Sequence, residues 1–156
     1  MFTAATCLAM ALYYEARGEG QEGMLAVAEV IVNRVQHPDF PGTVCEVVKE
    51  DRGPASHDCQ FSFYCDGKPE NPQDLVAWST ARDVAQQALS GHVMGHGATY
   101  YHATSVHPFW ADVFKPVGKI GEHIFYVDSA KCVFPQCSLR PVARPWKDGE
   151  EDAGRG

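Results

Sequence analysis

Three glutamates and one arginine lie close together in the segment ALYYEARGEGQEG, residues 11–23. A carboxyl group that stays protonated near neutral pH can donate its proton to a leaving group, as in the cleavage of glycosidic bonds. Such a group needs a raised pKa, which usually comes from partial burial among apolar groups. The first question is therefore which of Glu15, Glu19 and Glu22 shares a surface with apolar residues.

Glu15 ends an apolar helical face. The spacing i, i+3, i+4 and i+7 of one face of a helix is occupied by Leu8, Ala11, Leu12 and Glu15. We expect this helix to begin at a cap on Thr3 or Thr6 and to stop at Gly18, because glycine tolerates the left-handed conformation that commonly follows a helix. Glu15 is the candidate acid, and a helix-end charge or a partner of Arg17 is the alternative.

The other glutamates near this segment suit structural roles. Glu19 and Glu22 flank glycines, so we expect both to be solvated and ionised. Glu29 lies in the apolar run AVAEVIV, on the side of Leu25 and Val32, where a paired structural charge is the better interpretation.

The remaining pattern predicts an α+β fold. Helical periodicity covers residues 21–36, 43–49 and 74–90, the last with Asp74 as its cap and Val76 among its apolar residues. The runs ATYYHA, FKPVGKI and HIFYVD predict a small antiparallel sheet with a turn at GKIGEH. Residues 50–74 read as a long loop, of a length that is often functional. We expect one catalytic domain over residues 1–140, with a substrate cleft between helices and sheet, and a polar, flexible tail over 141–156.

Composition excludes two classes of protein. The chain has 156 residues, with 13 basic and 20 acidic side chains, so it lacks the concentrated positive charge of a nucleic-acid-binding protein. No run approaches the roughly 18 apolar residues of a membrane span. The first six residues, MFTAAT, do not resemble a cleavable signal peptide.

Six cysteines in a chain of this length favour an oxidising compartment. Free core thiols and metal ligation remain alternatives, although no Cys-x2-Cys spacing supports a zinc site. The simplest of the possible pairings joins Cys7 to Cys45, Cys59 to Cys65 and Cys132 to Cys137.

A zinc-dependent amidase or peptidase is a rival reading of the histidines. His92 and His96 are four residues apart, which would place two imidazoles on one helical face, and three more histidines follow at 102, 107 and 123. Glycines surround the first pair and favour a loop, and no His-Glu-x-x-His motif is present. We therefore expect neither a catalytic metal nor another cofactor.

The run ALYYEARGEGQEGMLAVAEVIVNRVQHPDFPGTV resembles the SleB-type cell-wall hydrolases, the family of spore-cortex-lytic enzymes and their relatives. QFSF at 60–63, QQALSG, and ATYYHATSVHPFWADVFKPVGKIGEHIFY extend the resemblance over roughly residues 7–128. It implies a lysozyme-like or transglycosylase-like fold acting on the glycan strands of peptidoglycan, with the catalytic glutamate at Glu15.

We expect Glu15 to act alone as acid and then base, which would make the protein a lytic transglycosylase that cleaves between N-acetylmuramic acid and N-acetylglucosamine. A hydrolytic muramidase or glucosaminidase, which needs a second carboxylate, is the alternative, and a glycan-binding domain without turnover is a third possibility. Residues expected to bind substrate are Arg17, Gln60, Phe61, Ser62, Tyr101, His102 and Trp110. The aromatic side chains among them could equally belong to the core.

Peptidoglycan is the expected partner, and we expect a monomer. Its place of action would be the periplasm, the cell envelope or the outside of the cell. A phage endolysin, made in the host cytoplasm and acting on the wall, is an alternative source.

Overall fold

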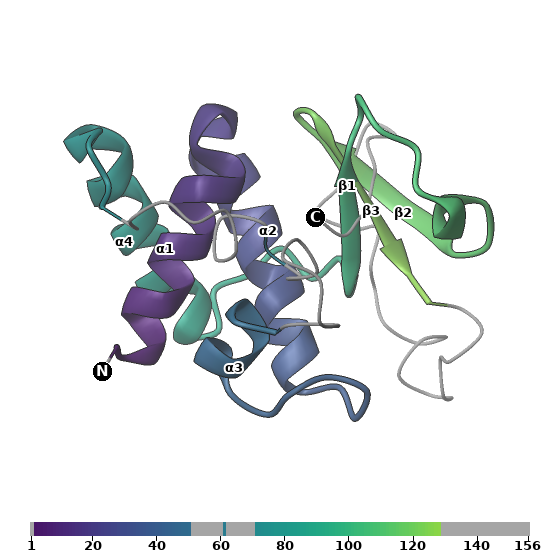
Figure 1. Ribbon diagram of the computed structural model, residues 1–156, viewed down its shortest axis with the longest axis horizontal. Coiled ribbons are helices and arrows are strands. Elements are labelled where there is room, and N and C mark those ends of the chain that lie inside the picture. The colour runs from purple at the N-terminus through teal and green to yellow at the C-terminus, as the bar shows by residue number, and fades with distance from the viewer. Residues whose placement is uncertain (1, 51–60, 62–70, 129–156) are drawn as a thin grey trace.

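Helices and a small sheet form two adjoining parts of the molecule (Figure 1). The computed structural model describes residues 2–50, 61 and 71–128. The helices are α1 (Ala4–Ala16), the 3-10 turn η1 (Arg17–Glu19), α2 (Gly20–Val35), α3 (Val44–Val48), α4 (Leu75–Leu89) and the 3-10 turn η3 (Phe109–Asp112). The strands are β1 (Tyr100–Ala103), β2 (Lys115–Ile120) and β3 (His123–Val127). The predicted α+β fold is confirmed.

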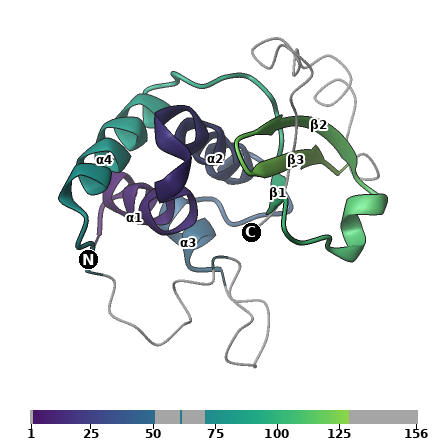
Figure 2. The same ribbon diagram turned by 90° about the horizontal axis from the view of Figure 1, so that it is seen from above.

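The first helix, α1, is the central element of the helical part. The Thr3 side chain caps it by accepting a hydrogen bond from the backbone N–H of Thr6, at 3.1 Å. Every residue from Cys7 to Tyr13 is buried, as expected for a helix that is enclosed on all sides. It packs against α2, α3 and α4, and Figure 2 shows the sheet lying beside α2.

The turn between α1 and α2 differs from the predicted one. The chain does not stop its helix at Gly18; it tightens into η1 and then turns at Gly20, whose φ of 76° lies in the region that favours glycine. The helix α2 follows at once. This short connection keeps Glu15 and Glu19 on either side of one turn, close to the sheet.

The helix α4 begins as predicted, with the Asp74 side chain accepting from the N–H of Ala77 at 3.0 Å. Its start is fastened to α1, because the Tyr13 hydroxyl accepts hydrogen bonds from the N–H groups of Gln73 and Asp74. Val76, which the sequence places among the apolar residues of this helix, is 79% exposed. It lies in the first turn, where Leu75 is also exposed while Ala77 and Trp78 pack against the core.

The sheet is antiparallel and its strand order is β1-β3-β2. Tyr101 pairs with Phe125 across β1 and β3, and a register shift between Pro116 and Gly118 interrupts the pairing of β2 with β3. Successive side chains of a strand point to opposite faces. One face of the sheet therefore carries Tyr101, while His102 points to the other.

A disulfide bond joins Cys7 in α1 to Cys45 in α3, as the simplest pairing predicted. The other four cysteines lie outside the described residues, as do most of the predicted loop of residues 50–74 and the tail from 141. Within the described ranges, each helix is too short or too polar to cross a lipid bilayer.

Replacing Cys7 and Cys45 together by serine should lower the free energy of unfolding by about 3 to 4 kcal/mol, because the bond closes a loop with a sequence separation of 38 residues. Urea unfolding followed by circular dichroism measures this change, with the unsubstituted protein as the control. An unchanged midpoint and slope would show that the disulfide does not constrain the unfolded chain.

Candidate active site

Glu15 and Tyr101 meet where the helical part faces the sheet. Glu15 lies in the last turn of α1 and is only partly exposed. The Tyr101 hydroxyl donates a hydrogen bond to Glu15 Oε1 at 2.7 Å. This contact joins residues that are 86 positions apart in the chain and brings two of the predicted site residues together.

The surroundings of Glu15 favour the protonated carboxyl. Burial raises its pKa above the ordinary value of 4.5, while the Tyr101 hydrogen bond and the positive charge of Arg34 act in the opposite direction. Burial is the largest effect. A carboxylic acid whose charged form also has two stabilising neighbours can both give up and take back a proton.

Arg34 supplies this positive charge from within the core. It lies in α2, is fully buried, and donates from Nε to the carbonyl oxygen of Thr99 at 2.7 Å. Three aromatic rings surround its guanidinium group, with centroids at 4.9, 5.6 and 5.5 Å; they belong to Phe40, Phe61 and Tyr100. No pattern in the sequence points to Arg34, because an arginine near a helix end usually faces solvent.

Phe61 therefore belongs to the core and not to a sugar-binding surface. Its exposed fraction is 0%, and its ring packs at Arg34. The sequence predicts that Phe61 could stack on a sugar. In this structure its ring has no exposed surface with which to meet a glycan. Gln60 and Ser62, the predicted hydrogen-bonding neighbours, lie outside the described residues, as does Phe63.

Tyr101 is held in place by residues on its own face of the sheet. Its ring stacks on Phe125, with centroids 5.8 Å apart, and the ring of His123 meets it edge-on at 5.2 Å. Phe125 and His123 both belong to β3. The position of the Tyr101 hydroxyl over Glu15 thus depends on the placement of β3.

His102 and Trp110 are separated from this contact. His102 stacks on Tyr126, receives or donates a hydrogen bond at the Tyr126 hydroxyl (2.9 Å), and lies edge-on to Trp110. These rings form a cluster on the opposite face from Tyr101 and Phe125. His102 points away from the face that carries Tyr101, because neighbouring strand residues alternate in direction. The expected binding of substrate by His102 and Trp110 stays a prediction.

Arg17 follows Glu15 by two residues and remains exposed. Its guanidinium group donates to the Tyr13 hydroxyl at 2.6 Å and lies 4.7 Å from the centre of that ring. Arg17 thus rests on α1, within one turn of Glu15. Its expected contact with substrate stays a prediction.

Glu19 contradicts the expectation of a solvated side chain. Only 14% of the side chain is exposed, and Oε1 accepts a hydrogen bond from the backbone N–H of Glu122 at 2.7 Å. The same oxygen lies 3.9 Å from His123 Nδ1. In the sequence alone, the glycines beside Glu19 favour exposure, but glycine also marks a place where chain segments approach closely.

Glu29 has the structural role that the sequence predicts. It is buried and accepts hydrogen bonds from the N–H groups of Gly95 and Gly97, at 2.8 and 3.0 Å. His96 is buried beside it and binds the carbonyl oxygen of Ala26 through Nε2. This carboxylate fixes the segment that leads into β1.

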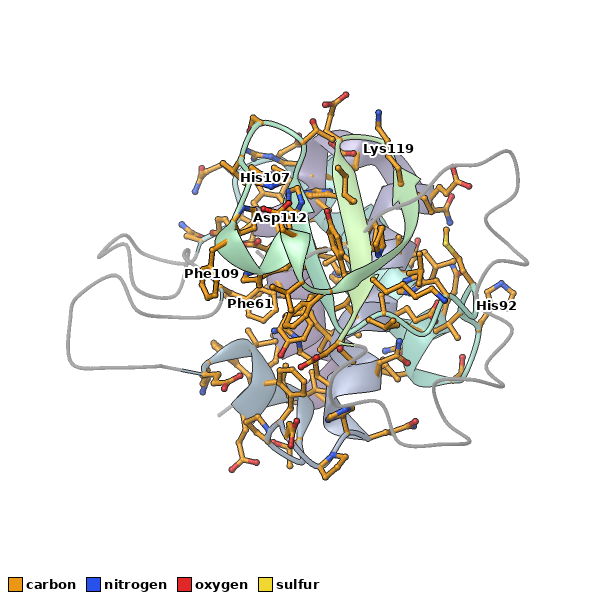
Figure 3. The ribbon with its side chains drawn as sticks, turned by 90° about the vertical axis from the view of Figure 1, so that its right-hand side faces the viewer. Phe61, His92, His107, Phe109, Asp112 and Lys119 are labelled. Carbon is orange, nitrogen blue, oxygen red and sulfur yellow. A yellow bond between two sulfur atoms is a disulfide. The ribbon has the colours of Figure 1, made fainter. Side chains whose placement is uncertain are left out.

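The histidines considered as zinc ligands do not gather into one cluster within the described residues. His96 uses Nδ1 for the N–H of Ala98 and Nε2 for Ala26, so both ring nitrogens are engaged. Figure 3 shows His92 on the opposite flank of the molecule from His107, which lies beside Asp112. Among residues 2–50, 61 and 71–128, no group of three or more histidine, cysteine or acidic residues could hold a metal ion.

A family model described as Cell Wall Hydrolase matches residues 18–126, most of the chain. The chain belongs to this cell wall hydrolase family. It is 36% identical over 119 residues to a spore cortex-lytic enzyme of Halalkalibacterium halodurans, which covers 76% of this chain and 33% of that protein. For the enzyme of the same name from Bacillus subtilis the identity is 35% over 120 residues, with 76% and 35% covered.

Two solved structures agree with this assignment. The catalytic domain of the germination-specific lytic transglycosylase SleB from Bacillus anthracis superposes with a TM-score of 0.60 and 30% identity, covering 80% of this chain and 93% of that one. The SleB catalytic domain from Bacillus cereus gives 0.63 and 32%, covering 80% and 88%. This cell wall hydrolase thus shares the fold of those catalytic domains, and it spans about a third of the length of the two curated relatives.

In this cell wall hydrolase, replacing Glu15 by glutamine should raise the melting temperature at pH 7. The folded-state pKa of Glu15 is raised, so its contribution to stability is complete below the unfolded value and is lost as the pH rises through the folded value. A neutral amide avoids that loss, and the gain should vanish below about pH 4. Thermal unfolding across this pH range measures it, with Glu22→Gln as an exposed control. A gain that persists at low pH would contradict the assigned burial of Glu15.

Proposed function

We propose that this protein cleaves the glycan strand of peptidoglycan between N-acetylmuramic acid and N-acetylglucosamine, as a lytic transglycosylase. The main observation behind this proposal is that Glu15 has a raised pKa and accepts a hydrogen bond from Tyr101 where the helices face the sheet. The resemblance to the SleB catalytic domain, described as a lytic transglycosylase, supports the reaction type. Glu15 lies just ahead of the residues matched by the family model, so its role is proposed from this geometry.

The proposed reaction needs one carboxyl group in two protonation states. Protonated Glu15 donates its proton to the glycosidic oxygen as the bond from that oxygen to C1 of muramic acid breaks. The 6-hydroxyl of the same sugar then attacks C1 and gives its proton to the Glu15 carboxylate. A 1,6-anhydro sugar forms, no water is consumed, and Glu15 returns to its starting state.

The neighbours of Glu15 suit both steps. Burial keeps the proton on Glu15 before the reaction, and this is the form that an acid requires. Tyr101 and Arg34 stabilise the carboxylate that exists between the two proton transfers. Arg17 is exposed within one turn of this group, so we include it as a substrate-binding residue.

The substrate places the site of action outside the cytoplasmic membrane. The disulfide between Cys7 and Cys45 fits this proposal, because such bonds persist in oxidising compartments and are rare in the cytosol. We therefore propose that the protein acts in the cell envelope or outside the cell.

Glu15→Gln should lower the rate of glycan release from purified sacculi by about a hundredfold or more, since general acid–base catalysis typically contributes that much. Mass spectrometry of the soluble products gives both the rate and the chemistry, with Glu22→Gln as a matched control on the neighbouring helix. The expected products end in 1,6-anhydro-muramic acid. A fully active Glu15→Gln protein would remove the proposal.

The same products separate the alternatives. Reducing sugar ends would show a hydrolase, which needs a second carboxylate or another route for water. Free peptides with intact glycan would show an amidase. Binding of sacculi without any soluble product would show a glycan-binding domain.

Tyr101→Phe should move the alkaline limb of the pH–rate profile to higher pH. The Tyr101 hydrogen bond lowers the pKa of Glu15, so its loss raises that pKa and keeps the acid protonated over a wider range. Initial rates on soluble glycan strands between pH 4 and 9 would measure the shift. Tyr14→Phe, which changes a partly buried tyrosine adjacent to Glu15 in sequence, is the control. A shift to lower pH would contradict the assigned role of the hydroxyl.

A further inference from the structure

The Glu19 side chain lies between the helical part and the turn that joins β2 to β3. Its carboxylate is largely buried, and Oε1 accepts from the N–H of Glu122 at 2.7 Å. The hydrogen bond connects residues 103 positions apart, so it joins η1 directly to the hairpin. A carboxylate that accepts a backbone N–H makes a charge-assisted hydrogen bond, which is among the stronger kinds in proteins.

Two glycines leave room for this side chain. A Cβ added at Gly23 would overlap Glu19 Cβ, and one added at Gly121 would overlap Glu19 Oε1. Gly121 also has a φ of 58°, as the turn requires. The helix α2 and the hairpin thus each carry a residue without a side chain where Glu19 passes between them.

The path from Glu19 to Glu15 is short and continuous. Glu19 lies beside His123, the first residue of β3, with 3.9 Å between Oε1 and Nδ1. The His123 ring packs edge-on against Tyr101 at 5.2 Å, and the Tyr101 hydroxyl donates to Glu15 at 2.7 Å. Displacing the start of β3 would therefore displace the tyrosine that meets the candidate acid.

We propose that Glu19 is a positioning residue for the reaction: by fixing the hairpin through the backbone N–H of Glu122, it keeps the adjoining His123 ring against Tyr101 and so holds the Tyr101 hydroxyl against Glu15. This inference rests on the proposed function of Glu15. It adds Glu19, which ends the η1 turn, to the residues on which the reaction depends. Glu19 acts through other residues and takes no part in the proton transfers. It contributes by fixing the position of the Tyr101 hydroxyl relative to the Glu15 carboxyl group.

The sharpest test moves the Glu19 carboxylate without removing it. Gly121→Ala places a methyl group at Glu19 Oε1, whereas Gly91→Ala introduces an alanine at another positive φ, 93°, with open space around it. Both variants carry backbone strain, so their difference reports the displaced carboxylate. Glu19→Ala removes the hydrogen bond, and Glu19→Gln keeps an oxygen that can accept from Glu122.

We expect Gly121→Ala and Glu19→Ala to lower kcat on soluble glycan strands by about tenfold to a hundredfold, as small misplacements of catalytic groups do. KM should change little, and Glu19→Gln and Gly91→Ala should stay close to the unsubstituted protein. A purely structural role would instead lower the folded fraction, which thermal unfolding reports, and leave kcat per folded molecule unchanged. That result, or equal kcat values for Gly121→Ala and Gly91→Ala, would overturn the proposal.

A second measurement is independent of turnover. Carbon-13 NMR of the Glu15 carboxyl group gives its titration directly, and a loosened Tyr101 contact should raise the pKa of Glu15 in Gly121→Ala but not in Gly91→Ala. An unshifted titration in Gly121→Ala would overturn the positioning role. If Glu15→Gln is fully active while the Gly121→Ala titration still shifts, the proposed function fails and the mechanical link from Glu19 to Glu15 stands.

Discussion

The hydrogen bond from Tyr101 to Glu15 is the contact on which the rest of the site depends. It is made between the last turn of a helix and the first strand of a sheet, so neither part of the fold could supply it alone. The helix also contributes through its direction, because the C-terminal end of a helix carries partial negative charge and disfavours a nearby carboxylate. Burial acts against ionisation of Glu15, and Tyr101 limits its effect.

Arg34 extends this balance into the core. A fully buried cation is costly unless its donors and charge find partners. Here a carbonyl oxygen and the faces of three aromatic rings lie against the guanidinium group, and its positive charge lowers the pKa of Glu15. The charged form of the acid is therefore stabilised in part by a cation that is itself buried in the core.

Local patterns in the sequence predicted the parts of the site that depend on one element. Helical spacing singled out Glu15, and the short aromatic run ATYYHA indicated the strand that carries Tyr101. Strand alternation alone could also have separated Tyr101 from His102, since adjacent residues point to opposite faces. The roles of Glu19, Arg34 and Phe61 could not be read in this way, because each depends on segments far apart in the chain. Flanking glycines in particular indicate either an open turn or a close approach, and only the fold distinguishes them.

The strand β2 is one of the two edges of the sheet formed by the described residues. β2 pairs with β3 on one side, and its exposed residues include Lys115, Pro116 and Lys119, with the register shift beside them. Lysines, proline and irregular pairing are the devices by which natural sheets discourage the addition of a foreign strand. At this edge, the sheet that holds Tyr101 in place is therefore a poor template for a strand from another molecule.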